Sequence, residues 1–487
     1  LWTSSENPDL SAKNTAERFF RSAGAAAFSQ FWRVGVAFGV DLILRRWIPP
    51  ADYGVWSWAL TAFLVLGALR DLGLIYHVVR VDPRPYGNLL VLELVWGSVL
   101  VVTTFFGAPL LARAYLETGS DLILVLKAMT LFLFFEGLAA VPKTYFEAEL
   151  EVGRVVKPEI VRNLVMAVIA VAMAWRGYGI WSLVIAQVTS AAVYAAYLWL
   201  RAWGKMPLHY VPGGTLKLVG RSWPLALIWF LIILVDRIDL LVLGAQESRS
   251  IVGNYEFAYS RAFLASTILT PAITRTLYPA LVAFRSRPEQ LFEAYRLATV
   301  LLVCAQAPIA LFLFANAEIT LRILGGPQWK QAPIYLAVLC FAPLIEPIGR
   351  LGGEVLKTLH RDGLWIVCSL LTLVSFGVGG WFATQKWGPM GMAWVNFLPL
   401  GGLLMAWALH RIAPQGFRRL LRDLLLIYLI PTLVFLLIYY ALADLELRFA
   451  VSLLALGLVI FVFWRRFGPQ FLAFFRDPVA ATEGRAT

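Results

Sequence analysis

Apolar stretches of about 20 residues recur from one end of this chain to the other, and this pattern limits what it can fold into. A helix of about that length crosses the ~30 Å hydrocarbon core of a bilayer. The sequence is 60% hydrophobic and 15% charged, whereas a soluble domain has roughly 45–50% apolar and about 25% charged residues. Helices are the expected element because a backbone in lipid must satisfy its own hydrogen bonds. We therefore predict an all-α polytopic membrane protein with about fourteen transmembrane helices.

The predicted spans are joined by short connections. They cover residues 23–47, 56–79, 88–112, 121–141, 159–175, 179–203, 222–244, 255–280, 294–317, 332–352, 363–385, 389–410, 422–442 and 445–464. Lys and Arg gather in the connections on the same side as the N-terminus, which is the distribution of cytoplasmic loops. We expect both termini in the cytoplasm. The net charge of +12 follows from this bias, so we expect no nucleic-acid partner.

A pattern near the start of the second span recurs near the start of the eighth. Residues 54–59 (GVWSWA) and 253–258 (GNYEFA) both read Gly, x, aromatic, x, aromatic, Ala, at an offset of 199 residues. Asp41 and Asp239 are offset by 198. This predicts a parallel repeat of two six-helix lobes with two extra C-terminal helices. The predicted regions are an N-terminal cytoplasmic segment 1–22, an N-lobe 23–203, a cytoplasmic linker 204–221, a C-lobe 222–410, helices thirteen and fourteen at 422–464, and a cytoplasmic tail 465–487.

Ionisable residues inside the spans are functional candidates, because inserting a charge costs about 2.5–3.5 kcal/mol on translocon scales. Span one carries Gln30, Arg33 and Asp41 within one broad stripe of the helix. Span eight carries Arg261 and Arg275, fourteen residues apart on a similar face. Arginine suits phosphate oxygens because its planar fork donates two parallel hydrogen bonds and stays charged. These cations favour an anionic cargo.

Other spans carry adjacent charges that point to different sides of a helix. Span two has Arg70 beside Asp71, and span seven has Asp236, Arg237 and Asp239. At most one or two members of each set can face a cavity, and we favour Arg70 and Arg237. A separate i, i+4 pair, Glu346 and Arg350, lies in a span with two prolines. We interpret that pair as an internal salt bridge or a gate hinge.

Three short segments carry a family resemblance. Residues 45–54 (RRWIPPADYG) and 71–74 (DLGL) resemble the first turn and the end of helix two in bacterial polysaccharide flippases. Residues 239–258, which hold DLLVLG and VGNYEFA, resemble a later segment of the same proteins. The chain is similar to the polysaccharide and O-antigen (Wzx-type) flippase family of the multidrug/oligosaccharidyl-lipid/polysaccharide (MOP) exporter superfamily.

The resemblance implies two lobes around a central cavity lined by helices one, two, seven and eight. The implied cationic substrate site consists of Arg33, Arg70, Arg237, Arg261 and Arg275. The candidate ion-coupling or cavity acids are Asp41, Asp239 and Asp236, and each has a salt bridge as its alternative role. The candidate sugar or gate contacts are Gln30, Trp56, Tyr255 and Tyr259, with an interfacial aromatic belt as the alternative for the aromatic residues.

The implied function is a transporter without a cofactor. The implied cargo is an undecaprenyl (polyprenyl) pyrophosphate-linked oligosaccharide repeat unit, flipped from the cytoplasmic to the outer leaflet by alternating access. Such transport serves O-antigen or exopolysaccharide biosynthesis in the bacterial cytoplasmic (inner) membrane. A polysaccharide polymerase and a chain-length regulator are the implied protein partners. Coupling to the membrane potential, H⁺ or Na⁺ stays open.

Other functions make different demands on the sequence. A MATE-like cation-coupled multidrug antiporter would use Asp41 as its cation site, but intramembrane arginines would repel a cationic drug. A lipid II flippase is a closer alternative. A polytopic glycosyltransferase or polymerase is disfavoured by the short outer loops. Cys304, Cys340 and Cys368 are too scattered for a disulfide framework or a zinc site, and we find no nucleotide-binding motif.

Overall fold

The structure is a computed structural model that describes residues 32–71, 84–116, 120–149, 151, 153–397 and 399–476. The described residues form helices joined by turns and short loops, with no strand among them. They divide into two compact units, Leu1–Ile233 and Leu234–Thr487, and we describe each by itself. The all-α polytopic prediction is confirmed for the described chain. The lobe boundaries predicted from the sequence stay a prediction.

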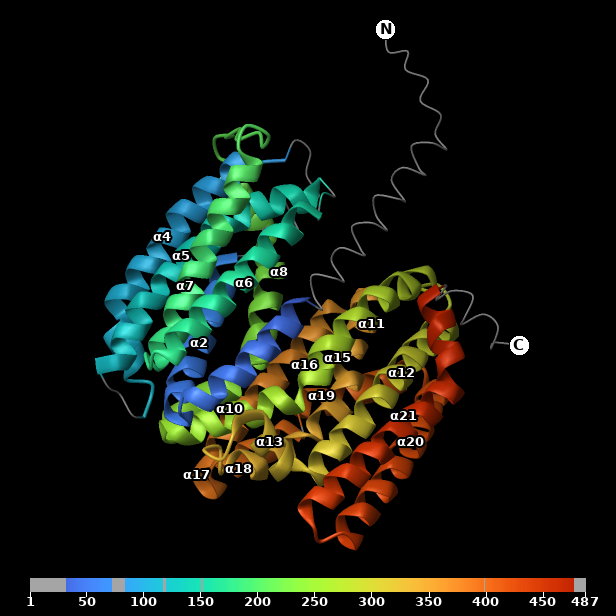
Figure 1. Cartoon of the computed structure of the whole chain (residues 1–487). Coiled ribbons are helices and arrows are strands. Elements are labelled where there is room, and N and C mark those ends of the chain that lie inside the picture. Colours follow the sequence, from blue (N-terminus) through green and yellow to red (C-terminus); the bar gives the residue numbers. More distant parts are fainter. Residues whose placement is uncertain are drawn as a thin grey trace. The chain divides into compact units, whose positions relative to one another are not determined.

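The first unit is built from long, unbroken helices (Figure 1). Its elements are a helix over residues 32–47, α2 (Pro50–Asp71), α4 (Tyr86–Ala112), α5 (Ser120–Ala148), α6 (Gly153–Trp175), α7 (Ile180–Ala202) and most of α8 (Gly214–Val235). Tyr86, Phe146 and Tyr194 bring α4, α5 and α7 into one buried cluster. The indole nitrogen of Trp199 also donates to the carbonyl oxygen of Leu138 at 2.8 Å, which ties α7 to α5.

The second unit contains many shorter helices. They are α9 (Ile238–Gln246), α10 (Arg249–Ala262), α11 (Leu264–Ala283), α12 (Pro288–Ala315), α13 (Ala317–Gly325), α14 (Ala332–Leu339), α15 (Ala342–Thr358), α16 (Asp362–Val374), the π-helix η1 (Ser375–Gly379), α17 (Gly380–Trp387), α18 (Pro389–Phe397), α19 (Leu400–Ile412), α20 (Pro414–Ala441) and α21 (Leu445–Arg476). Proline opens several helices in both units, since its missing N–H costs nothing in a first turn. Examples are Pro50, Pro288, Pro389 and Pro414.

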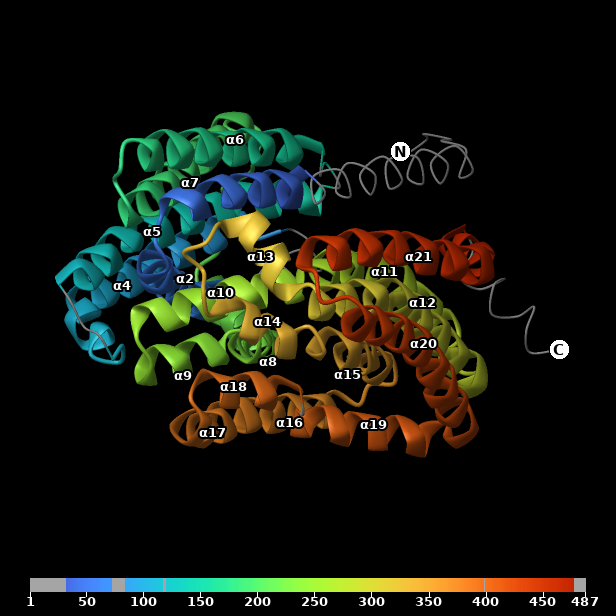
Figure 2. The same cartoon turned by 60° about the horizontal axis from the view of Figure 1, so that its bottom comes forward.

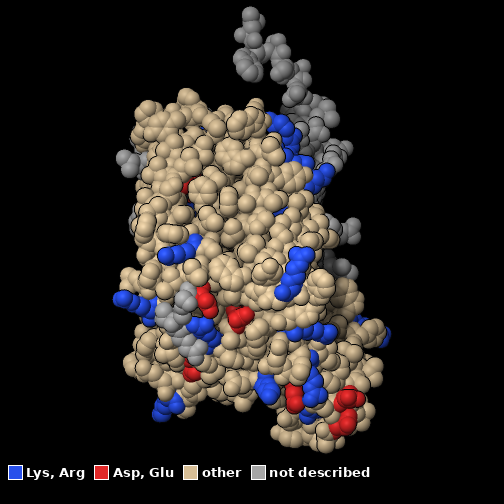
Figure 3. Space-filling view, turned by 60° about the vertical axis from the view of Figure 1, so that its left-hand side comes forward, with Lys and Arg blue, Asp and Glu red and all other residues tan. Residues whose placement is uncertain are grey.

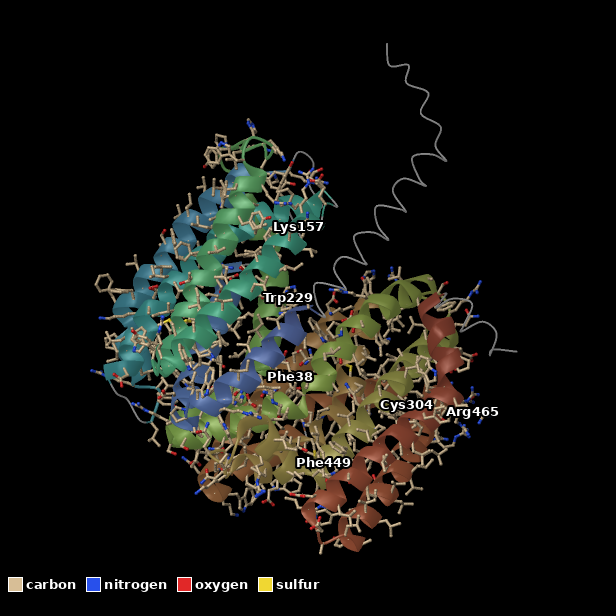
Figure 4. All side chains as sticks on the ribbon, viewed as in Figure 1. Phe38, Lys157, Trp229, Cys304, Phe449 and Arg465 are labelled. Carbon is tan, nitrogen blue, oxygen red and sulfur yellow. The ribbon has the colours of Figure 1, made fainter. Side chains whose placement is uncertain are left out.

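Helix α12 forms the centre of the second unit. Its most apolar 18-residue window is 83% buried, against 22% for α20 and 17% for α21. Figure 2 shows α20 and α21 lying alongside α12, where they cover one of its sides. Figure 4 shows Cys304 of α12 inside this unit and Arg465 of α21 at its outer edge. The two C-terminal helices are thus an outer layer that packs on a buried helix.

Nine helices of the described chain are long and apolar enough to cross a membrane, or ten if the bent pair α14 and α15 is one span. Every one of the fourteen predicted windows falls on helical segments where it is described. The helix count is lower partly because two windows fall on interrupted helices. Window 222–244 is split between α8 and α9, and window 255–280 between α10 and α11. Figure 3 shows one face of the molecule, on which charged side chains gather mainly in the lower half and uncharged side chains cover most of the upper half.

Candidate functional site

An aspartate and a tyrosine meet in the same way in each unit. In the first unit, the Tyr53 hydroxyl donates to Asp41 Oδ1 at 3.4 Å, and Arg45 Nε donates to Asp41 Oδ2 at 2.8 Å. In the second unit, the Tyr255 hydroxyl lies 3.5 Å from Asp239 Oδ2, to which it donates. Asp41 lies on the helix over residues 32–47, and Tyr53 lies on the next helix, α2. Asp239 lies on α9, and Tyr255 lies on the next helix, α10. Tyr53 and Tyr255 are not at matching positions of the predicted repeat, because an offset of 199 residues pairs Tyr255 with Trp56, so the internal repeat stays a prediction.

The second of these pairs is completely enclosed. Tyr255 and Asp239 are 0% and 2% exposed. The Leu240 backbone N–H donates to Asp239 Oδ1 at 2.8 Å, and Asn396 Nδ2 donates to the Tyr255 hydroxyl at 2.9 Å. These contacts join α9, α10 and α18 through hydrogen bonds. Asp239 therefore has a structural role in the described arrangement, and its predicted role in ion coupling stays a prediction.

Arg70 lies inside the first unit in contact with acidic groups. Its guanidinium pairs with Asp71 and with Glu93 Oε2, the latter at 3.5 Å from Nε. Arg70 Nη1 also donates to the carbonyl oxygen of Leu133 at 3.1 Å. A Cβ at position 137 would lie only 3.1 Å from Glu93 Oε2, so Gly137 allows the charged groups to approach α5. The structure thus places Arg70 in a buried ion pair that links α2, α4 and α5.

A second ion pair extends these charged contacts to α6. Arg162 Nη2 lies 2.5 Å from Glu136 Oε1, and the Arg162 guanidinium lies 5.1 Å from the ring centre of Tyr194 on α7. All these charges are on helices without breaks. They hold the first unit together, and none of them needs a ligand to be neutralised.

The second unit differs because some of its charges lie where helices are interrupted. The chain leaves helical geometry at Asp236 and Arg237, between α8 and α9, and again at Phe263, between α10 and α11. Helices α14 and α15 are bent by 46°. Interrupted helices within a membrane leave backbone and polar groups available to ions and substrates, and they commonly mark binding sites in transporters.

A charged cluster occupies this region, and we name it the break cluster: Asp236, Glu346 and Arg350. Arg350 Nη2 lies 3.1 Å from Asp236 Oδ1, and Arg350 Nε lies 2.5 Å from Glu346 Oε1. The predicted salt bridge between Glu346 and Arg350 is confirmed. The third member, Asp236, comes from a position 114 residues away. The side chains of Arg350 and Asp236 are 43% and 41% exposed, whereas Glu346 is 17% exposed.

Uncharged polar groups hold the Glu346 carboxylate in place through hydrogen bonds. The Ser266 hydroxyl on α11 donates to Glu346 Oε2. Gln306 Nε2 on α12 donates to Ser266 Oγ at 3.1 Å, and Thr270 Oγ1 lies 3.4 Å from the same hydroxyl. Ser266, Thr270 and Gln306 are buried. The break cluster therefore has an enclosed polar side and an exposed charged side.

An aromatic ladder runs along α10 toward the α10–α11 break. The Tyr255 and Tyr259 rings have centres 6.4 Å apart, and the Tyr259 and Phe263 rings stack at 4.4 Å. Tyr259 and Phe263 are half-buried. The exposed parts of the Tyr259 and Phe263 rings can pack against sugar rings or lipid chains.

The remaining predicted residues are dispersed. Gln30 lies outside the described residues. Arg33 is exposed on the helix over residues 32–47, Arg275 is exposed on α11, and Arg237 is half-buried at the start of α9. Arg261 is buried, with its guanidinium 5.2 Å from the Phe257 ring centre. Trp56 is buried within α2. The roles assigned to these residues stay predictions.

The described residues contain no group of three or more His, Cys, Asp or Glu able to hold a metal ion. The three cysteines are buried free thiols. Ser266 and Gln306 were not identified from the sequence, because nothing in their local pattern links them to a carboxylate on another helix.

Comparisons with known proteins agree with this architecture. Residues 43–333 match a family described as polysaccharide biosynthesis proteins, and this segment is more than half of the chain. The chain belongs to this family. The polysaccharide biosynthesis protein is 23% identical over 372 residues, 72% of each chain, to the succinoglycan biosynthesis transport protein ExoT of Rhizobium meliloti (strain 1021). It is 28% identical over 126 residues to the lipopolysaccharide biosynthesis protein WzxC of Escherichia coli (strain K12), which covers 26% of this chain and 25% of WzxC.

Solved structures are similar in fold. The lipid II flippase MurJ in an inward closed conformation matches with a TM-score of 0.75 at 12% identity, over 93% of this chain and 100% of MurJ. An inward-facing multidrug resistance MATE family transporter matches with a TM-score of 0.67 at 13% identity, over 81% of this chain and 95% of the transporter. The polysaccharide biosynthesis protein is therefore a multi-pass membrane protein with the fold of the MOP exporter superfamily. Its identification from sequence as a transporter of the polysaccharide flippase type is confirmed.

Proposed function

We propose that this polysaccharide biosynthesis protein flips an undecaprenyl pyrophosphate-linked oligosaccharide repeat unit from the cytoplasmic to the outer leaflet. The proposed membrane is the bacterial cytoplasmic membrane, with both chain termini in the cytoplasm. The family and its transporter relatives support a lipid-linked saccharide as cargo. The pyrophosphate and the polyprenyl chain are the finer part of the proposal.

The observation that carries this proposal is the exposure of arginines within predicted spans. Arg33 and Arg275 are exposed in the structure. A guanidinium exposed to hydrocarbon is costly, so an exposed arginine at membrane depth faces water or a polar cargo. A cationic aqueous pathway attracts anions and repels cationic drugs. This charge favours a pyrophosphate-bearing lipid over the cargo of a multidrug antiporter.

The membrane potential supplies a driving force in the required direction. A pyrophosphate diester has about two negative charges, and an inside-negative potential moves negative charge outward. At roughly 2.3 kcal/mol per charge per 100 mV, complete transfer of two charges across a potential of about 100 mV gains about 4.6 kcal/mol. The flippase then needs no nucleotide, and H⁺ or Na⁺ antiport would add to this gradient.

The aromatic ladder of α10 supports the saccharide part of the cargo. Tyr259 and Phe263 are half-buried beside the break cluster's helices and stack with each other. A sugar ring can pack on such a face while its phosphates contact arginine. The polyprenyl chain would stay in the bilayer, because each buried methylene contributes about 0.8 kcal/mol.

Transport in proteoliposomes of known orientation tests the proposal. A labelled undecaprenyl pyrophosphate oligosaccharide is incorporated into the inner leaflet, and a membrane-impermeant glycosidase reports its arrival in the outer leaflet. We expect translocation that accelerates under an inside-negative potential. Lipid II serves as a second cargo, and a cationic dye driven by a proton gradient tests the antiporter alternative. Dye export without movement of either lipid would refute the proposed function.

A further inference from the structure

Two arginines of the second unit are each shared by two carboxylates. Arg350 contacts Asp236 and Glu346, as described above. Arg296 on α12 lies 2.5 Å from Glu293 Oε1 and also pairs with Asp423 on α20. We call each group of one arginine and two carboxylates a triad. In the Arg296 triad, Asp423 also lies 3.8 Å from Arg422 Nη2.

The two triads differ in how far their arginine side chains are exposed. The side chain of Arg296 is 14% exposed and fastens α20 to α12. Arg350 is 43% exposed, and its partner Asp236 lies where the helix is interrupted. A stabilising ion pair has no need of this exposure, since exposed pairs contribute only about 0–1 kcal/mol. The position of the Arg350 triad therefore suits exchange of its partners rather than structural stability.

An anion that binds Arg350 must displace the carboxylates that already occupy its donors. A phosphate diester has a single phosphate group, so it cannot replace both carboxylates, and the remaining carboxylate competes for the guanidinium. A pyrophosphate has two phosphate groups, so it can take both places on the guanidinium and accept parallel hydrogen bonds from its fork. The surrounding charges add little positive potential, because Arg237 in the same break is offset by the buried Asp239.

We propose that Asp236 and Glu346 act as guards that keep lipids with a single phosphate group off Arg350 while admitting a pyrophosphate. The inference rests on the proposed function and specifies how that site selects its cargo. Selection of this kind is needed because a bacterial membrane presents many singly charged phospholipids for each molecule of cargo. Hydrogen bonds from Ser266, and from Gln306 to Ser266, support Glu346. Asp236 is the more exposed of the two guards.

Binding measurements on the purified full chain in nanodiscs test the proposal. The probes are undecaprenyl pyrophosphate, undecaprenyl monophosphate and phosphatidylglycerol. For the wild type we expect a strong preference for the pyrophosphate. Asp236→Asn and Glu346→Gln should each lower the ratio of pyrophosphate to monophosphate affinity by about tenfold, because monophosphate and phosphatidylglycerol bind more tightly. Phosphatidylglycerol should then inhibit flipping by these variants more than flipping by the wild type.

The Arg296 triad provides matched controls. Glu293→Gln and Asp423→Asn each remove one carboxylate from a guanidinium that is enclosed, and they should leave the affinity ratio unchanged. An unchanged ratio in both guard variants, or a ratio lowered only through weaker pyrophosphate binding, would overturn the guard proposal while wild-type flipping still supported the function. A wild type that binds no pyrophosphate and flips no lipid would remove both. If one guard variant fails to fold, the affinity ratio measured for the other variant decides whether the guard proposal holds.

Discussion

The Asp52 carboxylate at the start of α2 accepts a hydrogen bond from the backbone N–H of Ile180, 3.2 Å away at the start of α7. Asp52 thus satisfies an N–H group at a helix start, where no helical partner exists. The contact joins positions 128 residues apart. It depends on Gly179, whose φ of +52° and ψ of −129° suit only glycine.

Replacing Gly179 with Ala should therefore destabilise the first unit. A Cβ there would lie 2.6 Å from Asp52 Oδ2, in addition to the backbone strain. Gly177→Ala is the matched control, because that glycine also has a positive φ, +82°, but open space around it. We expect a loss of about 1–3 kcal/mol from strain alone in the control and a larger loss at Gly179. Thermal unfolding in detergent measures both, and equal losses would show that the Asp52 contact contributes nothing.

Arg33→Gln should abolish flipping while the amount of folded protein stays normal. Arg33 is exposed within a predicted span, and an exposed side chain contributes little to packing. Lys127→Gln is the control, since this lysine lies over the Phe105 ring at 5.2 Å and is assigned no contact with cargo. The proteoliposome assay reads out both variants. Wild-type rates for Arg33→Gln would exclude this arginine from the cationic pathway.

Arg70 and Glu93 test whether the first unit's buried charges are structural. Removing one partner of a buried ion pair leaves the other uncompensated and costs about 3–5 kcal/mol. Arg70→Met or Glu93→Leu should each lower the unfolding temperature strongly, and the double variant should recover much of the loss. Flipping by a stable double variant would show that Arg70 binds no substrate. A stable but inactive double variant would restore the predicted role in the cavity.

Tyr255→Phe should cost more stability than Tyr53→Phe. The Tyr255 hydroxyl contacts both Asp239 and Asn396 in a fully enclosed site. Its removal leaves two buried polar groups without this partner, at about 1–3 kcal/mol each. The Tyr53 hydroxyl contacts Asp41, whose other oxygen still accepts from Arg45. Chemical denaturation of the two variants provides the comparison, and a smaller loss at Tyr255 would contradict it.

Much of the helical framework could be predicted from the sequence, because spans in lipid require long apolar runs. The windows at 88–112 and 179–203 lie within two residues of the ends of α4 and α7. The interruption at Asp236 could not be located in this way. Adjacent charges such as Asp236 and Arg237 do not by themselves distinguish a break from a helix, since Arg70 and Asp71 are adjacent within the unbroken α2.

The candidate site was only partly accessible to the same reasoning. Helical spacing identified the contact between Glu346 and Arg350 because four residues bring two side chains to one face. Spacing could not identify Asp236 as their partner, since that contact depends on tertiary packing. Arg70 shows the converse case. Its position within a span gave no sign that it is buried and paired with Glu93 on α4, and its predicted role in a cavity stays a prediction.

The burial of α12 has a consequence for how the polypeptide is made. Ribosomes deliver α12 to the membrane about a hundred residues before α20, which supplies Asp423 for Arg296. Until α20 and α21 arrive, the central helix of the second unit lacks its outer cover, and Arg296 has only Glu293 from its own helix. A nascent chain that stops before Pro414 is therefore an incomplete folding unit, and membrane proteases should recognise it as one.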